Sequence, residues 1–164
     1  MPVRLRQYAY FGIYSDTVTA SDITARLGVE PDAVRVLGSR SADPALPRHH
    51  SWRVVSERPD LTVADHLDNI VNRLSPYAGA IGDLVEEIVL ASPGTIGVGS
   101  VLEVVRHFDD DEGEEEQVLV VDQPDGGQLE RLPGQHHLLG WRLTPRVIDF
   151  LRITHAVLDI DEYG

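Results

Sequence analysis

The densest group of reactive side chains is the acidic run DDDEGEEE. A calcium loop of the EF-hand type needs glycine at its sixth position, and placing Gly113 there puts Phe108 at the first position, where a ligand is required. We therefore expect either a solvated hairpin tip or a docking surface for a partner rich in arginine or lysine. The candidate docking residues are Asp109, Asp110, Asp111, Glu112, Glu114, Glu115 and Glu116.

Histidine is the next residue type that suggests chemistry. Seven histidines include two adjacent pairs, His49-His50 and His136-His137, both in predicted loops. Adjacent side chains on a strand point in opposite directions, so neither pair easily holds one metal ion. A metal-assisted site would need loop histidines to converge with His107 across the fold. The sequence assigns no metal ligand.

Two further carboxylates, Asp159 and Asp161, are two residues apart and share one face of a predicted strand. Paired carboxylates perform acid–base chemistry where their environments differ. More commonly such a pair marks the solvated face of a terminal strand, which is the interpretation we favour.

Missing residue types exclude several classes of protein. All 14 basic residues are arginine, so a Walker phosphate loop and Schiff-base chemistry, including pyridoxal phosphate attachment, lack their lysine. Without cysteine there is no disulfide, thiolate nucleophile or cysteine zinc site. The glycines at 94–99 do not fit a dinucleotide fingerprint, because position 102 is leucine. We assign no catalytic or cofactor-binding residue and expect no cofactor.

Charge limits the choice of partner. The net charge is −13, and residues 61–164 carry 6 arginines against 20 acidic residues. Such a surface repels nucleic acid and anionic membrane, so we expect a protein partner, one with basic groups. The chain lacks a membrane-spanning run and a signal peptide, which predicts a cytoplasmic location. Its length predicts one domain, 1–164, with an acidic hairpin or loop insertion at about 109–135.

The stretch 19–38 supports two interpretations. Thr19 and Asp22 have the spacing of a capping box, and Gly28 is suited to end the helix that follows. The apolar spacing is also that of a helix-turn-helix DNA binder. Its second helix, however, would present only Arg35 to bases in a strongly acidic chain. We favour a short helix that delivers the chain to a strand.

The remaining pattern predicts an α+β fold with a mainly antiparallel sheet and helices packed on one face. It begins with a ferredoxin-like βαββα unit and continues with an added hairpin and a C-terminal helix and strand. Residues 81–90 fit either a helix or a strand, and we favour a helix to Glu87. We expect Val147, Ile148 and Leu151 to be buried on the last helix. The expected strands are 7–14, 33–37, 51–57, 98–108 with 117–122 as its hairpin partner, and 156–163. In the first strand, Ala9, Phe11 and Ile13 are expected on one face, and Tyr8, Tyr10, Gly12 and Tyr14 on the other. Helices are expected at 62–74, where Thr62 and Asp65 repeat the capping-box spacing, and from 144, and loops at 39–50 and 123–135.

An ordered set of short motifs resembles a bacterial family, domain of unknown function 4279. The set comprises DIT..LG..P at 22–31, Gly38, Ser51-Trp52, HL..I...L at 66–74, G.RLTP at 140–145 and LDIDEY at 158–163. The resemblance implies a small cytoplasmic bacterial protein of an uncharacterised family and carries over no catalytic residue. The acidic segment at 109–134 is longer than the family pattern.

These observations favour a non-catalytic binding or protein-interaction module with an acidic surface, in a regulatory or immunity-type role. The alternative is a metal-assisted, hydrolase-like enzyme that uses loop histidines and carboxylates. DNA binding through 19–38 is the third hypothesis. The sequence does not determine the oligomeric state.

Overall fold

A computed structural model describes residues 4–109, 119–122, 128–131 and 141–163, and in this part of the chain the strands form one five-stranded sheet and two small hairpins. The strand order of the main sheet is β2-β5-β1-β6-β9. Neighbouring strands are antiparallel except β6 and β9, which are parallel. The fold is therefore α+β, as predicted, with a mixed sheet. The strands are β1 (Arg4–Ser15), β2 (Ala33–Arg35), β5 (His50–Ser56), β6 (Gly99–Asp109) and β9 (Val157–Tyr163), with hairpins β3 (Ser41–Ala42)/β4 (Ala45–Leu46) and β7 (Leu119–Asp122)/β8 (Gln128–Arg131).

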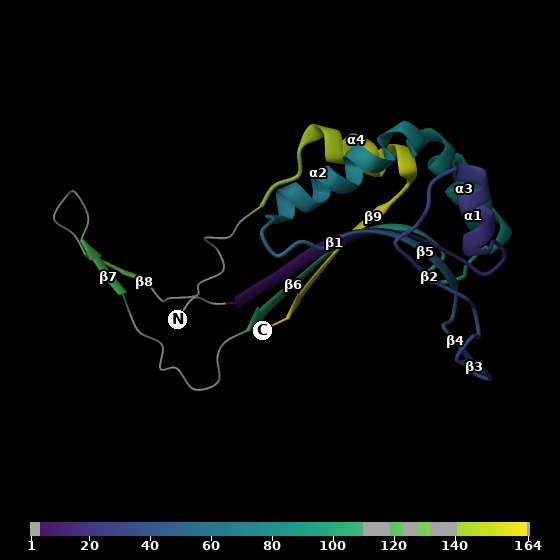
Figure 1. The fold of residues 1–164 in the computed structure, drawn as a ribbon, viewed down its shortest axis with the longest axis horizontal. Helices are drawn as coiled ribbons and strands as arrows, with labels where there is room; N and C mark the ends of the chain where they lie inside the picture. Colours follow the sequence, from purple (N-terminus) through teal and green to yellow (C-terminus); the bar gives the residue numbers. More distant parts are fainter. Residues whose placement is uncertain (1–3, 110–118, 123–127, 132–140, 164) are drawn as a thin grey trace.

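The helices lie together on one face of this sheet (Figure 1). They are α1 (Ala20–Leu27), α2 (Val63–Leu74), α3 (Ala78–Ala91) and α4 (Pro145–Thr154), with a 3₁₀ turn, η1 (Ser75–Tyr77), between α2 and α3. Thr19 and Thr62 each form the predicted capping box, and Gly28 ends α1 in the left-handed conformation at φ 69°. None of the described helices is long and apolar enough to cross a membrane.

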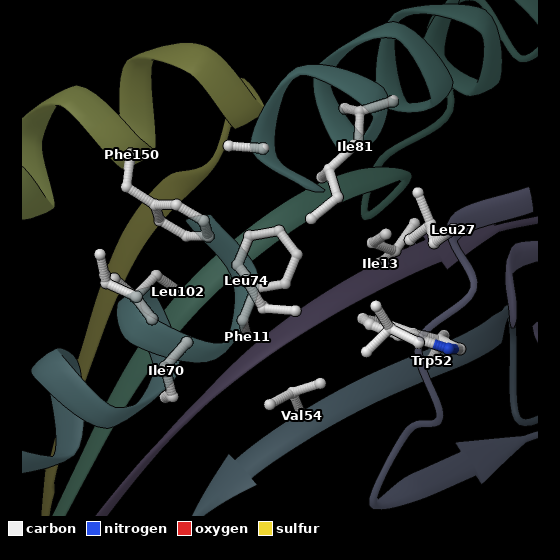
Figure 2. Close-up of a cluster of buried hydrophobic side chains, with 14 of the residues drawn as sticks. Phe11, Ile13, Leu27, Trp52, Val54, Ile70, Leu74, Ile81, Leu102 and Phe150 are labelled. Carbon is white, nitrogen blue, oxygen red and sulfur yellow. The ribbon is translucent and has the colours of Figure 1, made fainter. Parts of the chain in front are cut away.

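One hydrophobic core joins the helices to the covered face of the sheet. The central strand β1 contributes Ala9, Phe11 and Ile13, all fully buried, and Figure 2 shows Phe11 and Ile13 beside side chains from the helices and neighbouring strands. Phe11 meets Phe150 of α4 edge to face, with ring centroids 5.4 Å apart. Trp52 of β5 is also fully buried, and its indole N–H donates to Thr24 Oγ1 of α1 at 3.1 Å. Strand alternation had predicted which residues of β1 face the same way.

The structure corrects the predicted pairing of 98–108 with 117–122. Strand β6 lies between β1 and β9, whereas β7 pairs with β8 in a separate hairpin. Part of the predicted loop 123–135 is therefore the strand β8. Alternation shows which side chains share a face, but it does not identify the neighbouring strand, because pairing depends on long-range contacts.

Other boundaries also differ from the prediction. Residues 81–90 belong to α3, which runs to Ala91, so the strand alternative is wrong and the favoured helix is confirmed and longer. On α4, Val147 is buried as predicted, but Ile148 is 50% exposed and Phe150 lies in the core instead. Strand β2 ends at Arg35, and the predicted loop 39–50 contains the hairpin β3–β4.

The helix-turn-helix hypothesis for 19–38 is wrong. Its second helix is missing, because Ala33–Arg35 is an extended strand paired antiparallel with β5. The stretch is a crossover: α1 packs Ile23 and Leu27 into the core and leads to the edge strand β2.

Two glycines of α3 provide a matched test of the contact between α3 and α4. A Cβ on Gly82 would lie 2.2 Å from the backbone oxygen of Ile153, whereas a Cβ on Gly79 meets nothing within 4 Å. We expect Gly82→Ala to lower the free energy of unfolding by about 1–3 kcal/mol, because the α4 backbone must move. Gly79→Ala should raise it by about 1 kcal/mol, the usual gain in an exposed helix. Urea unfolding of both variants measures the difference, and equal effects would contradict this packing.

Candidate functional site

The face of the sheet opposite the helices is the candidate site, and we call it the open face. Residues of β1 that alternate with the buried Ala9, Phe11 and Ile13 point to it. Their cross-strand partners share that face. No described helix covers it (Figure 1). Its aromatic and charged residues include Arg6, Tyr8, Tyr10, Tyr14, Arg35, Arg53, Glu103, His107, Asp159, Asp161 and Tyr163.

Three aromatic rings form a ladder across the open face, one each from β1, β6 and β9. His107 stacks on Tyr163 with centroids 4.7 Å apart and a 13° interplanar angle, and Tyr8 lies 6.5 Å away on its other side. Tyr163 at the outer end is 51% exposed. On the β5 side, the Arg53 guanidinium lies 4.6 Å from the Tyr10 ring centroid and 5.4 Å from that of Tyr14. Aromatic side chains and cation–π contacts thus hold much of this surface in place.

Three carboxylates, Glu103, Asp159 and Asp161, lie on the β6–β9 side, and we call them the acidic edge. The Tyr10 hydroxyl donates to Glu103 Oε2, and the Tyr163 hydroxyl donates to Asp161 Oδ2 at 3.1 Å. Burial, followed by the charges of Asp161 and Asp159, raises the pKa of Glu103 against the opposing effect of the Tyr10 hydrogen bond. The hydrogen bond to Asp161 is the main cause that raises the pKa of Tyr163. The acidic edge therefore has a local excess of negative charge that a cation would relieve.

The charges around these rings differ from those of a typical nucleic-acid site. Exposed aromatic rings on an open sheet are typical of single-strand binders, in which bases stack on the rings. Such sites surround the rings with lysine and arginine to neutralise phosphates. Here the exposed ring of Tyr163 is beside Asp161, in a chain of net charge −13. Arginine or lysine side chains of a partner can both pair with the carboxylates and stack on the ring.

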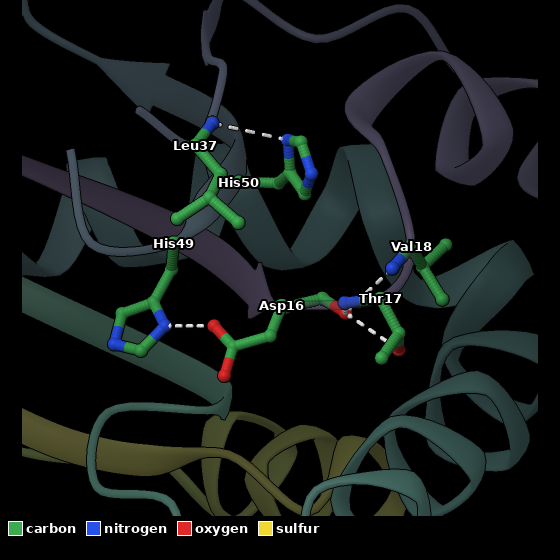
Figure 3. A network of polar contacts seen from close by, with 7 residues as sticks. Asp16, Thr17, Val18, Leu37, His49 and His50 are labelled. Carbon is green, nitrogen blue, oxygen red and sulfur yellow. Dashed lines mark hydrogen bonds and ion pairs between the residues drawn. The ribbon is translucent and has the colours of Figure 1, made fainter. Parts of the chain in front are cut away.

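A second polar cluster lies where β1 ends and β5 begins (Figure 3). His49 Nδ1 is 2.5 Å from Asp16 Oδ1, and the Leu37 amide donates to His50 Nδ1 at 3.2 Å. A Cβ on Gly97 would lie 3.0 Å from His49 Nε2, so the imidazole packs closely on the loop before β6. These contacts tie three loops together, which accounts for the His49-His50 pair structurally.

A third feature is a cavity of about 320 Å³ beside β5 and α2. Ser56 is in its wall, and its hydroxyl is 2.8 Å from Nδ1 of the fully buried His66. Asn69 Nδ2 donates to the same hydroxyl at 3.4 Å. Burial is the main cause that lowers the pKa of His66, so the ring is neutral near pH 7. The hydrogen bond between His66 and Ser56 connects α2 to β5. The lining residues are Val54, Val55, Ser56, Glu57, Arg58, Asn69, Ile70 and Arg73.

The structure describes some of the site residues that the sequence predicted and brings only some of these together. Asp109 is the last residue of β6, and 110–116 lie outside the described residues, as do His136 and His137. His49 and His107 do not converge: His50 pairs with Ser15 at one end of β1, and His107 pairs with Arg6 towards the other. Within the described ranges, no three His, Asp or Glu side chains are grouped as a metal site requires. The carboxylates Asp159 and Asp161 do share the open face, as their spacing predicted.

Sequence reasoning missed Glu103, His66 and the ladder. The alternation of YAYFGIY indicated that Tyr8, Tyr10 and Tyr14 share a face, but the partners on β6 and β9 require the strand order. His66 precedes Ile70 by four residues, and this helical spacing was a signal that it faces the core.

The burial of His66 predicts a specific dependence of stability on pH. Because its folded pKa is lowered, the unfolded chain binds the proton more readily, and stability is lost as pH falls below the ordinary value of about 6.5. We expect His66→Asn, which can keep a hydrogen bond to Ser56, to flatten unfolding free energy between about pH 7.5 and 5.5.

The control is His155→Asn, at an exposed left-handed position that asparagine tolerates. It should leave the pH profile as in the wild type. Urea unfolding at several pH values measures how the unfolding free energy depends on pH. The same pH dependence in the wild type and His66→Asn would contradict the role given to His66.

Comparison with known proteins gives a family match in the first part of the chain. No curated protein and no solved structure matches the sequence. The family described as Domain of unknown function (DUF4279) matches residues 5–91, which extend from β1 through α3 and include both capping boxes and Trp52. Since this match covers more than half of the 164 residues, the chain belongs to the DUF4279 family.

Proposed function

We propose that the protein is a non-catalytic module that binds a basic segment of another protein on the open face of its sheet. The observation that carries the proposal is the acidic edge beside the exposed ring of Tyr163. The carboxylates attract arginine and lysine from a distance, and the ring offers a cation–π contact on arrival. Binding without turnover is compatible with a regulatory or an immunity-type role.

The acidic run Asp109–Glu116 is proposed as an additional contact on charge alone. It begins at the last residue of β6 and contributes seven carboxylates to the acidic second half of the chain. Neutralising this run separately from the acidic edge distinguishes the two contributions to binding.

We also propose a ferredoxin-like classification for β1-α1-β2-β5-α2-β6. Strand β5 lies between β1 and β2 and is antiparallel to both, which is the arrangement of a split βαβ unit. The parallel strand β9 extends this unit on the β6 side.

Binding of a basic probe tests the proposed function. The probe is a fluorescein-labelled peptide of seven residues in which arginine and valine alternate, measured by anisotropy against the full chain. We expect Asp159→Asn/Asp161→Asn to weaken binding by about tenfold, because two charge pairs are lost. Affinity for the wild type should also fall as salt is raised.

The matched control is Asp83→Asn/Glu86→Gln, which removes two exposed charges from α3 on the other side of the molecule. It should bind the probe like the wild type. Equal loss in both double variants would show that net charge, and not the open face, attracts the peptide. Absence of binding at low salt would contradict the proposed function.

A further inference from the structure

Strand β9 is one of the two edge strands of the main sheet, and it carries Asp159 and Asp161 of the acidic edge. It pairs with β6 on one side, and in the described part of the chain no strand pairs with its other side. Its seven residues include Val157 at 65% exposure, Ile160 at 44% and Tyr163 at 51%. A long edge strand with exposed apolar side chains is a template for another strand.

The backbone of β9 shows which of its groups point outward. Along a strand, N–H and C=O groups of alternate residues point to opposite sides. The Ile160 amide donates to the carboxylate of its own neighbour, Asp159 Oδ1, at 3.0 Å. This carboxylate takes the place of a carbonyl from an adjacent strand. Leu158, Ile160 and Glu162 are thus the residues whose backbone groups face the free edge.

A second copy of the same strand is a poor occupant. An antiparallel ladder centred on Ile160 places Asp159 of one copy opposite Asp161 of the other, and ladders centred on Asp159 or Asp161 place each opposite itself. Like charges directly opposite are destabilising in a sheet, and Glu103 on the adjacent strand adds to the repulsion. The occupant that matches this edge carries the opposite charge.

We propose that the basic partner binds by adding an antiparallel strand to β9. In that strand, arginine or lysine alternates with apolar residues. Basic side chains lie opposite Asp159 and Asp161 on the open face, and apolar ones lie opposite Leu158 and Ile160 on the other. The incoming carbonyl replaces Asp159 at the Ile160 amide and frees this carboxylate for a basic side chain. This inference rests on the proposed function and specifies its binding mode.

The register predicts which amides of the partner are essential. Residues directly opposite each other in an antiparallel pair either exchange both hydrogen bonds or exchange none. Because Leu158 and Ile160 face the edge, the valines of the alternating probe donate to β9, and its arginine amides point away. N-methylation of the valines should therefore weaken binding by about tenfold or more, while N-methylation of the arginines leaves it unchanged.

The experiment compares the parent probe and the two methylated probes on the full chain at low salt. Loss for the valine-methylated probe alone supports strand addition. Equal binding of all three overturns strand addition and leaves the proposed function standing, since charge is unaltered by methylation. Equal loss for both methylated probes also overturns it. If none of the three binds, the proposed function itself fails.

A variant of the chain locates the added strand. Ile160→Pro removes the outward amide and leaves the bonds to β6 in place, because proline is tolerated at edge positions whose N–H faces solvent. A thermal melt verifies that the variant is folded. We expect about tenfold weaker binding of the parent probe. A folded variant with unchanged affinity overturns the assignment to β9, and the probe comparison stands independently if the variant unfolds.

Discussion

A sheet that packs all its helices on one face must make its other face compatible with water through its own side chains. In this protein the central strand β1 meets both demands by alternation. Ala9, Phe11 and Ile13 are buried under the helices, and Tyr8, Tyr10 and Tyr14 point the other way. The tyrosine rings are large enough to cover neighbouring backbone. Tyr8 and Tyr14 stay partly exposed, and the buried Tyr10 donates its hydroxyl to Glu103. On β6 and β9, the side chains of the acidic edge and the ladder cover the same face.

The charged groups of the protein differ in how firmly contacts within the fold hold them. Arg53 is held between tyrosine rings, and the cluster of Asp16, His49 and His50 ties loops together. These groups are occupied by the fold. Asp159 and Tyr163 instead lie on an edge strand whose outer side has no neighbouring strand in the described ranges. We therefore propose that a basic partner gains most from the charge at this free edge.

Local chemistry made much of this fold predictable. The capping boxes at Thr19 and Thr62, the stop at Gly28 and the alternation in β1 were correctly predicted, because each depends on residues close in sequence. The neighbours of β6 were not, since β9 lies some fifty residues further along the chain and α4 must cross over to bring it alongside. Ile148 was misplaced because on a short helix Val147 is compatible with two adjacent stripes. Of the site, the shared face of Asp159 and Asp161 was predicted, whereas Glu103 required the register.

The proposed binding surface is the open face of the sheet and not the helical layer. Hydrogen–deuterium exchange of the full chain with and without a saturating basic peptide can locate this surface, because exchange reports backbone protection element by element. Binding on the open face should slow exchange in β9 and β6 and leave exchange in α1 to α4 unchanged. Protection confined to the helices or to the hairpin β3–β4 would contradict it.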